Sequence, residues 1–205
     1  AALLGPDVGL SPMTEPSASE QTAARHERTR DLVFGGMMIA LGVLAPIAFH
    51  AAGWGGAIFL PMHLPVLMAG LLVSWRVALF VGLLTPIVSS ALTGMPPPLP
   101  TTPIMAVELI VLAVAASLLR RTGMSVWVAA PLAIGARIAI RPAIFLLAVP
   151  LLQVEAGFRE FVIVTLLQGW PGIVLQILLA PTLVALIEGQ RTAHVASSTG
   201  EVDPP

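Results

Sequence analysis

Four residue types are missing from the 205-residue sequence: cysteine, lysine, asparagine and tyrosine. Without cysteine the chain can form no disulfide bond, no thiolate metal site and no thiol nucleophile. Without lysine it can form no Schiff base and no phosphate-binding P-loop, so it is not itself an ordinary ATPase. Charged residues are also scarce, at 10% of the sequence compared with about 25% in soluble domains. Together with a hydrophobic fraction of 57%, this scarcity predicts an integral membrane protein.

The few charged residues leave long uncharged runs between them. No Asp, Glu or Arg occurs in residues 32–75, 77–107 or 161–187. Each run exceeds the roughly 20 apolar residues that a helix needs to cross a bilayer, and the first has room for two crossings. Divided at its turn signals and charges, the sequence predicts an all-α membrane protein with six transmembrane helices, at about residues 33–52, 57–74, 77–92, 103–119, 124–152 and 161–187.

The two ends of the sequence differ from this apolar middle. Residues 1–31 are rich in Ser, Thr, Glu, Ala and Pro, and residues 189–205 are polar. Both ends are therefore predicted to be disordered tails around a membrane domain at 32–188. The charges before residue 32 precede an apolar run too long for a cleavable signal peptide. Met13 begins a segment typical of a natural start, so we expect residues 1–12 to be an upstream extension.

Arginines predict which side of the membrane each end occupies. If the N-terminus is cytoplasmic, only Arg159 among the arginines near helix ends lies outside. The seven on the inside are Arg25, Arg28, Arg30, Arg76, Arg120, Arg121 and Arg191. Because cytoplasmic loops carry the excess of arginine, this bias predicts that both termini are cytoplasmic. A net charge of −1 gives no reason to expect nucleic-acid binding.

Three charged residues remain at membrane depth, where each needs an explanation. Arg137 and Arg141 are four residues apart on one predicted helix, so they share a face and repel each other. Glu108 is the one acidic residue at comparable depth. One interpretation is an outward-facing binding site in which Arg141, with Arg137, meets an anionic group such as a ligand carboxylate. The other is structural: Glu108 pairs with one arginine, while the second snorkels or bonds carbonyls that Pro142 leaves free.

Other polar or aromatic residues are candidates for the same site. His63 lies between Pro61 and Pro65, which leave nearby carbonyls unpaired, so it could bond a ligand or simply hold its helix. Trp54 lies beside a glycine turn and could stack on a ligand, although tryptophans near helix ends usually anchor a protein at the membrane interface. Gln168, in the outer part of the last predicted helix, is a further possible hydrogen-bond donor.

Catalysis and metal binding have little support in the sequence. No serine at membrane depth has a credible His and Asp partner, and no zinc-protease motif occurs. His50 and His63 have no nearby Asp or Cys to complete a metal site. We therefore expect no enzyme activity, no metal and no cofactor.

Three segments of the apolar region are similar to those of a known family. They are FLPMHLPVLMAG at residues 59–70, GLLTPIVSS at 82–90 and LTGMPP at 92–97. Over about residues 33–188 the sequence resembles the substrate-binding S components of energy-coupling factor (ECF) transporters. This resemblance implies capture of a vitamin or related micronutrient at the plasma membrane of a bacterium or archaeon. It also implies partners, namely a transmembrane coupling subunit and two ATPase subunits that hydrolyse ATP.

The resemblance further suggests a docking strip and a class of substrate. In the family the first helix often carries Ala-x-x-x-Ala for docking on the coupling subunit, and the nearest match here is Gly36-x-x-x-Ala40. Such small residues also serve internal packing. An arginine-rich pocket suits a carboxylate-bearing vitamin, with pantothenate-like compounds nearest, while riboflavin-like, pyridoxine-like and cobalamin-precursor substrates remain open. The competing hypotheses are an autonomous secondary carrier and a structural or regulatory membrane subunit without a ligand.

Overall fold

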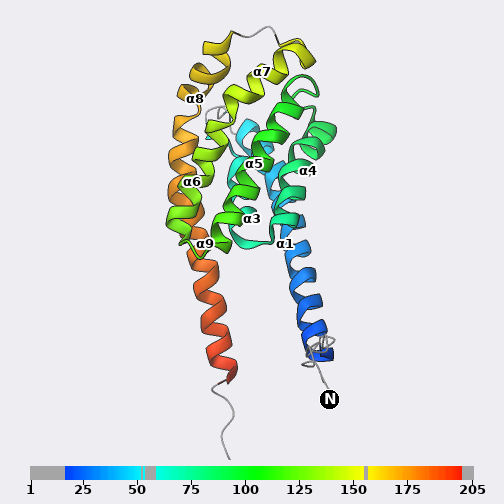
Figure 1. The fold of residues 1–205 in the computed structure, drawn as a ribbon, viewed down its shortest axis with the longest axis vertical. Helices are drawn as coiled ribbons and strands as arrows, with labels where there is room; N and C mark the ends of the chain where they lie inside the picture. Colours follow the sequence, from blue (N-terminus) through cyan, green and yellow to red (C-terminus); the bar gives the residue numbers. More distant parts are fainter. Residues whose placement is uncertain (1–16, 52, 54–58, 155–156, 200–205) are drawn as a thin grey trace, which may run out of the picture.

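The computed structural model describes residues 17–51, 53, 59–154 and 157–199, and within these residues it contains helices and no strands (Figure 1). The all-α prediction is thus confirmed. Five helical segments are long and apolar enough to cross a membrane, as expected of a multi-pass membrane protein. They are Ala18–Phe49, Trp75–Thr93, Thr101–Arg121, Val126–Leu152 and Trp170–Gln190.

The helices form a bundle, and different helices lie at its two ends (Figure 1). Their bounds are Ala18–Ala51 for α1, His63–Leu72 for α3, Trp75–Thr93 for α4, Thr101–Arg121 for α5, Val126–Ala139 for α6 and Arg141–Leu152 for α7. A π-helix, η1, follows at Arg159–Val164, then α8 at Thr165–Gln168 and α9 at Trp170–Thr199. The start of α1 and the end of α9 project from the same end of the bundle, and α7 lies at the other end (Figure 1).

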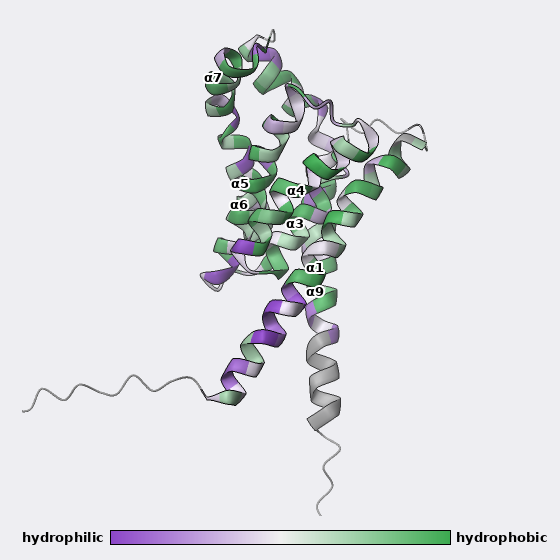
Figure 2. Ribbon diagram, turned by 90° about the vertical axis from the view of Figure 1, so that its right-hand side faces the viewer, coloured by the Kyte–Doolittle hydropathy of each residue, from purple (hydrophilic) through white to green (hydrophobic). Residues whose placement is uncertain are grey.

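The first and last helices, α1 and α9, extend beyond the apolar runs from which they were predicted. Residues 18–31 and 189–199 are helical, so the prediction of disordered tails is wrong for these two segments. At the start of α1, the Ser17 backbone N–H donates to the Glu20 carboxylate, and the Ser17 hydroxyl accepts a bond from the Glu20 backbone N–H. This reciprocal pair is a capping box, which stabilises a helix start. Figure 2 shows that the first turns of α1 are hydrophilic and lie beyond the apolar bundle.

Two of the predicted long helices are broken. The predicted helix at 124–152 is divided into α6 and α7 at Ile140, because Pro142 has no N–H to donate and its ring collides with the carbonyl one turn earlier. The predicted helix at 161–187 begins as the π-helix η1 and breaks again at Gly169. These breaks lie in the half of the molecule that contains α7 (Figure 1).

The predicted crossing at 57–74 is described from Phe59 onward, and within these residues helix α3 begins only at His63. It follows Leu60, which has a positive φ of 49°, and Pro61. The resulting helix, α3, has ten residues, too few to span a bilayer by itself. The prediction of six full crossings is therefore not what the described residues show.

Helix α3 lies at the centre of the bundle. It packs against α1, α4, α5, α6 and α9, and its Val66, Leu67 and Ala69 are completely buried. Gly70 allows α5 to come close, since a Cβ there would lie 2.5 Å from the Ala113 carbonyl oxygen. A helix that is apolar on all sides is expected to be surrounded by protein, and α3 positions the residues at its first turn inside the bundle.

Candidate functional site

A cavity of about 310 Å³ lies where the broken helices meet. Its walls come from the segment before α3, the start of α5, the junction of α6 and α7, η1, α8 and the start of α9. The polar residues that line it are His63, Thr101, Glu108, Arg137, Arg141 and Thr165; the remaining residues are Leu60, Pro100, Ile104, Met105, Ile138, Val154, Phe161, Leu166, Gly169 and Ile173. The volume is at the small end of the range for ligand sites, so a small molecule would fit.

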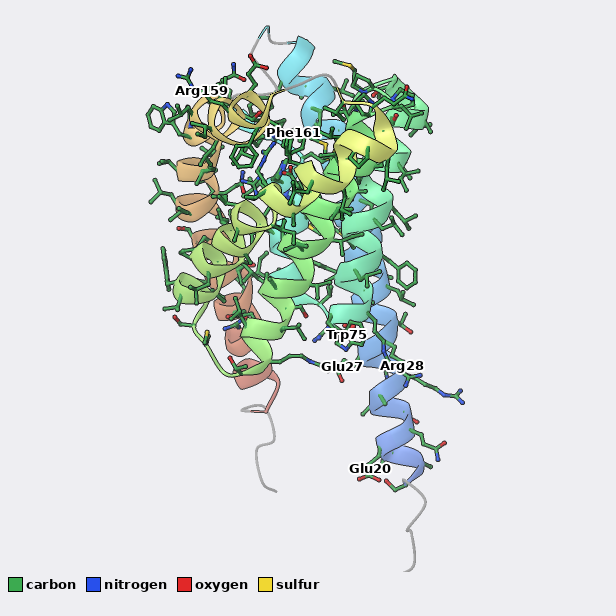
Figure 3. The ribbon with its side chains drawn as sticks, turned by 45° about the horizontal axis from the view of Figure 1, so that its top comes forward. Glu20, Glu27, Arg28, Trp75, Arg159 and Phe161 are labelled. Carbon is green, nitrogen blue, oxygen red and sulfur yellow. The ribbon has the colours of Figure 1, made fainter. Side chains whose placement is uncertain are left out.

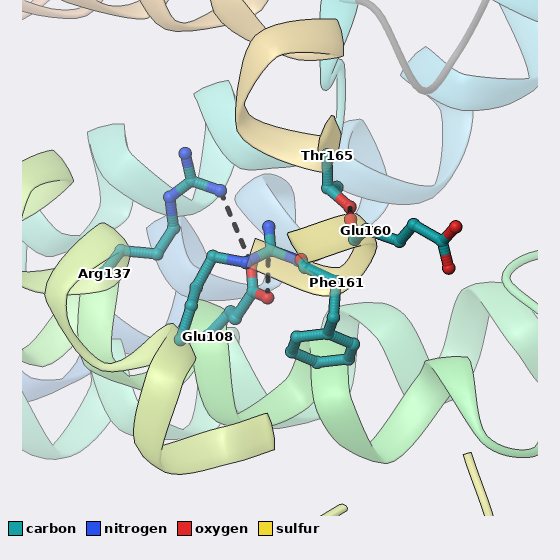
Figure 4. A network of polar contacts seen from close by, with 6 residues as sticks. Glu108, Arg137, Glu160, Phe161 and Thr165 are labelled. Atoms are coloured by element: carbon teal, nitrogen blue, oxygen red, sulfur yellow. Dashed lines mark hydrogen bonds and ion pairs between the residues drawn. The ribbon is translucent and has the colours of Figure 1, made fainter. Parts of the chain in front are cut away.

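Glu108 lies between the two arginines, and each of its carboxylate oxygens faces a different one. Figure 4 shows the contact between Glu108 and Arg137. Oε2 is 3.5 Å from Nη1 of Arg137, and Oε1 is 3.5 Å from Nη1 of Arg141. The exposed fractions are 6% for Glu108, 2% for Arg137 and 9% for Arg141. Because charge-assisted hydrogen bonds are usually about 2.7–2.9 Å long, Glu108 is shared between the arginines and bound tightly to neither.

Arg141 is also anchored to the π-helix. Its Nη2 donates a hydrogen bond of 2.9 Å to the Phe161 carbonyl oxygen, and its guanidinium carbon lies 5.3 Å from the centre of the Phe161 ring. The break at Pro142 makes Arg141 the first residue of α7, so its side chain leaves the chain at a helix start. Phe161 also contacts Phe145 of α7, with ring centres 5.5 Å apart. These contacts hold α7 and η1 together at the edge of the cavity.

His63 has no hydrogen-bond partner within the part of the chain that the structure describes. Its side chain is only 1% exposed and both of its ring nitrogens lack a described partner. The same is true of Nε in Arg137 and in Arg141. Buried polar groups are nearly always paired, so these atoms are available to a bound molecule or to water.

The sequence-based candidates for the site have different places in the structure. Arg137, Arg141, Glu108 and His63 all line the cavity, although they come from four helices. Gln168 does not line the cavity: its side chain is exposed at the end of α8. The segment differs from the continuous helix that was predicted, because it starts as the π-helix η1 and is interrupted at Gly169.

Three other sequence-based candidates are not among the described residues that line the cavity. Trp54 is outside the described residues. Gly36 and Ala40 are exposed on α1, and no atom lies within 4 Å of a Cβ built on Gly36. The strip that they form therefore serves no packing among the described helices.

Three polar or aromatic residues near the cavity were not predicted from sequence. Phe161 and Thr165 line it, but both lie on the segment whose π-helical geometry cannot be read from apolar periodicity. Gln176 is fully buried on α9, with no described partner for its amide, one turn beyond the cavity-lining Ile173. Its position within an uncharged run of the sequence was the available signal, since a polar side chain at membrane depth needs an explanation.

A second polar cleft of about 360 Å³ lies between α1, the turn after α3, α5 and α9. Its carboxylates are Glu27, Asp31 and Glu188, and its arginines are Arg30, Arg120 and Arg121. Figure 3 shows Glu27 and Arg28 at this end, while Phe161 lies among the helices near the other end. Arg120 and Glu188 form an ion pair of 2.5 Å that joins α5 to α9. The charges of this cleft balance, in contrast to those of the first cavity.

No group of His, Cys, Asp and Glu side chains in the described ranges is arranged to hold a metal ion. Comparison with known proteins adds no relative: no protein-family model, curated protein or solved structure matches this chain. The function must therefore be argued from the cavity and from the sequence segments that surround it.

Proposed function

We propose that this chain is the substrate-binding S component of an ECF-type importer. In this role it captures a vitamin or related micronutrient in the cavity between α3, α5, α6 and α9. It then delivers the molecule inward together with a transmembrane coupling subunit and two ATPase subunits. The chain itself is not an enzyme, because the partner subunits hydrolyse ATP. The observation that carries the proposal is a small cavity lined by two arginines, one glutamate and a buried histidine that has no partner among the described residues.

Of the segments that carry the family resemblance, one lines this cavity and another shortly precedes a part of its wall in the sequence. The segment at 59–70 supplies Leu60 and His63 to its wall. The segment at 92–97 is followed in the sequence by Pro100 and by Thr101, the first residue of α5, and both line the same cavity. The loop is held by hydrogen bonds from the Ser89 hydroxyl to the Met95 carbonyl and from the Thr102 hydroxyl to the Pro97 carbonyl, of 2.7 and 2.9 Å. The segment at 59–70 thus contributes both to the resemblance and to the wall of the cavity, which supports the proposal.

The position of the charges supports an outward-facing cavity. Arg120 and Arg121 lie at the end of α5, whereas the cavity lies at its start. Because arginines concentrate on the cytoplasmic side, the cavity would open toward the outside of a bacterial or archaeal plasma membrane. The start of α1 and the end of α9 would then lie in the cytoplasm, where the ATPase subunits are (Figure 1).

The exposed strip on α1 supports a membrane partner. Gly36 and Ala40 lie among exposed apolar residues that include Val33, Met37 and Leu44. Small residues in such a surface allow another helix to approach closely. We propose that this strip docks on the coupling subunit.

Ligand-dependent stability is the first test of the function. The full chain should be purified in detergent and heated with each compound of a vitamin panel, and any molecule that co-purifies should be identified by mass spectrometry. Binding at a ligand concentration of 100 times Kd stabilises a protein by about 2.7 kcal/mol, so one compound should raise Tm by several degrees. If no compound raises Tm and none co-purifies, the proposed capture function is wrong.

Uptake in cells distinguishes an S component from an autonomous carrier. Cells that lack any coupling subunit and ATPase partner should show no uptake when only this chain is expressed. Uptake under these conditions would favour the secondary carrier.

The contacts of Arg141 favour one alternative. Its bonds to Glu108 and to the Phe161 carbonyl also suit a structural or regulatory membrane subunit that holds its helices together without a ligand. In that case Arg141→Ala would unfold the protein and no vitamin would stabilise it.

A further inference from the structure

The charges that line the cavity do not balance. Among its described lining residues, Arg137 and Arg141 are positive and Glu108 is negative, which leaves one positive charge when histidine is counted as neutral. Arginine cannot lose its proton in a protein, so burial does not remove the excess. A buried charge without a counter-charge is costly. A ligand with one negative charge would complete the set.

The two arginines are not equally free to hold that ligand. Arg141 uses Nη1 toward Glu108 and Nη2 toward the Phe161 carbonyl, so two of its three nitrogens are engaged. The hydrogen bond of Arg137 to Glu108 uses Nη1. Its Nε, on the opposite edge of the guanidinium, is buried and has no partner within the described residues. The Nε–Nη2 edge of Arg137 is therefore the better place for a bidentate carboxylate.

The rest of the wall indicates what else the ligand carries. Both ring nitrogens of His63 lack a partner in the part of the chain that the structure describes, and they suit a hydroxyl, amide or ring nitrogen of the ligand. Most other lining residues are apolar, including Ile104, Met105 and Ile173. These walls favour a compact ligand with an apolar or heterocyclic body, a single carboxylate and one further hydrogen-bonding group.

From these observations we infer that the cavity selects monoanionic carboxylates, that Arg137 holds the carboxylate, and that Glu108 sets the charge selectivity. Glu108 neutralises one of the two arginines, so the site is complementary to one negative charge and not to two. Phosphate monoesters and dicarboxylates would leave an excess of negative charge, while neutral amides would leave the arginine unpaired. This inference rests on the proposed capture function and narrows its substrate class.

Matched compounds test the charge rule directly. The monoanions are nicotinate, biotin, lipoate and pantothenate, and each has a neutral amide or alcohol of nearly the same shape. Pyridine-2,3-dicarboxylate and 4′-phosphopantothenate carry more negative charge on two of the same skeletons. At pH 7 we expect at least one monoanion to bind, and its neutral analogue and its more highly charged analogue to bind at least 10-fold more weakly. A neutral, cationic or dianionic compound that binds best, or that co-purifies, would overturn the inference while leaving the capture function intact.

Variants of the arginines test the assignment of the carboxylate. Arg137→Lys keeps the charge but loses the bidentate edge, so affinity for the bound monoanion should fall about 10- to 100-fold, as for loss of a hydrogen bond to a charged group. Arg141→Lys should change this affinity about threefold or less, since Arg141 is engaged with protein groups. The opposite ranking of the two variants would show that Arg141 holds the carboxylate.

Variants of Glu108 separate charge number from position. Glu108→Gln leaves two positive charges, so the binding preference should shift at least 10-fold toward the matched dianion. Adding Arg141→Gln returns the cavity to one positive charge, and the double variant should again prefer the monoanion. If the double variant prefers dianions, or if both variants keep the wild-type preference, Glu108 does not set selectivity. If no compound binds or co-purifies with the wild-type protein, the capture function fails as well.

Discussion

The Asp31 carboxylate accepts a hydrogen bond of 2.8 Å from the backbone N–H of Ser74, which directly precedes α4. Asp31 belongs to α1 and is only 6% exposed. Ser74 has extended backbone and makes no side-chain cap of its own. The first N–H groups of a helix need acceptors, and negative charge is favourable there. The first turn of α4 has no acidic residue of its own, and Asp31 of α1 supplies a negative charge there.

Asp31→Ala should destabilise the protein by about 2 kcal/mol, because it removes a part-buried hydrogen bond between a charged group and a backbone N–H. The measurement is thermal unfolding of the purified protein in detergent. Glu27→Ala is the matched control, since Glu27 is an exposed carboxylate of the same helix. Equal Tm values for the two variants would show that the bond to Ser74 contributes nothing.

Gly70→Ala should cost about 1–3 kcal/mol, because a Cβ there would meet the backbone of α5 and the helices would have to separate. The nearest atom is the Ala113 carbonyl oxygen, 2.5 Å away. Gly36→Ala is the control in an exposed helical position, with nothing within 4 Å of the added atom. It should leave stability unchanged or raise it by up to about 1 kcal/mol, owing to the better helix propensity of alanine. Equal losses in the two variants would contradict close packing of α3 on α5.

The unbroken helices α4 and α5 were predicted well, because each coincides with a regular apolar run of the sequence. The predicted helices at 77–92 and 103–119 agree with α4 and α5 to within two residues at each end. Hydropathy reports how long a segment stays apolar, so it misses helix that continues into water. The start of α1 is such a case, although the Ser17–Glu20 capping box was visible in the sequence.

The broken helices were harder to predict, because a proline inside a membrane helix can kink, break or be tolerated. Pro131 and Pro150 lie within helices, whereas Pro142 follows the break between α6 and α7. Neighbouring segments that satisfy the freed backbone groups decide among these outcomes, and a sequence does not show those neighbours. The four candidates His63, Glu108, Arg137 and Arg141 nevertheless line one cavity. They could be selected from sequence because a charged or histidine side chain at membrane depth needs a polar environment. Gln168 does not line this cavity, because its side chain is exposed at the end of α8, and the sequence does not show which way that segment faces.

Gly36→Leu with Ala40→Leu should abolish coupled uptake while leaving Tm and ligand binding unchanged. Leucine side chains would fill the flat strip on α1 and keep a partner helix away. Gly135→Leu is the control, since Gly135 is likewise exposed on α6 with nothing within 4 Å of an added Cβ. Uptake is measured in cells that express the coupling and ATPase subunits. Normal uptake by the double variant would place the docking surface elsewhere.

Glu108→Gln without ligand should lower the free energy of unfolding by about 3 kcal/mol, because removal of one member of a buried ion pair leaves the remaining charges uncompensated. Arg137 and Arg141 both lose their carboxylate contact in this variant. Adding Arg137→Gln removes one of the two stranded charges, so the double variant should be more stable than Glu108→Gln alone. Such non-additivity is expected for residues in one network and is measured with a double-mutant cycle. Glu160→Gln, at an exposed carboxylate, should change stability by no more than about 0.5 kcal/mol. If Glu108→Gln lowers the free energy of unfolding no more than this control, then water in the cavity solvates the arginine charges. Glu108 would in that case contribute to ligand binding and not to stability.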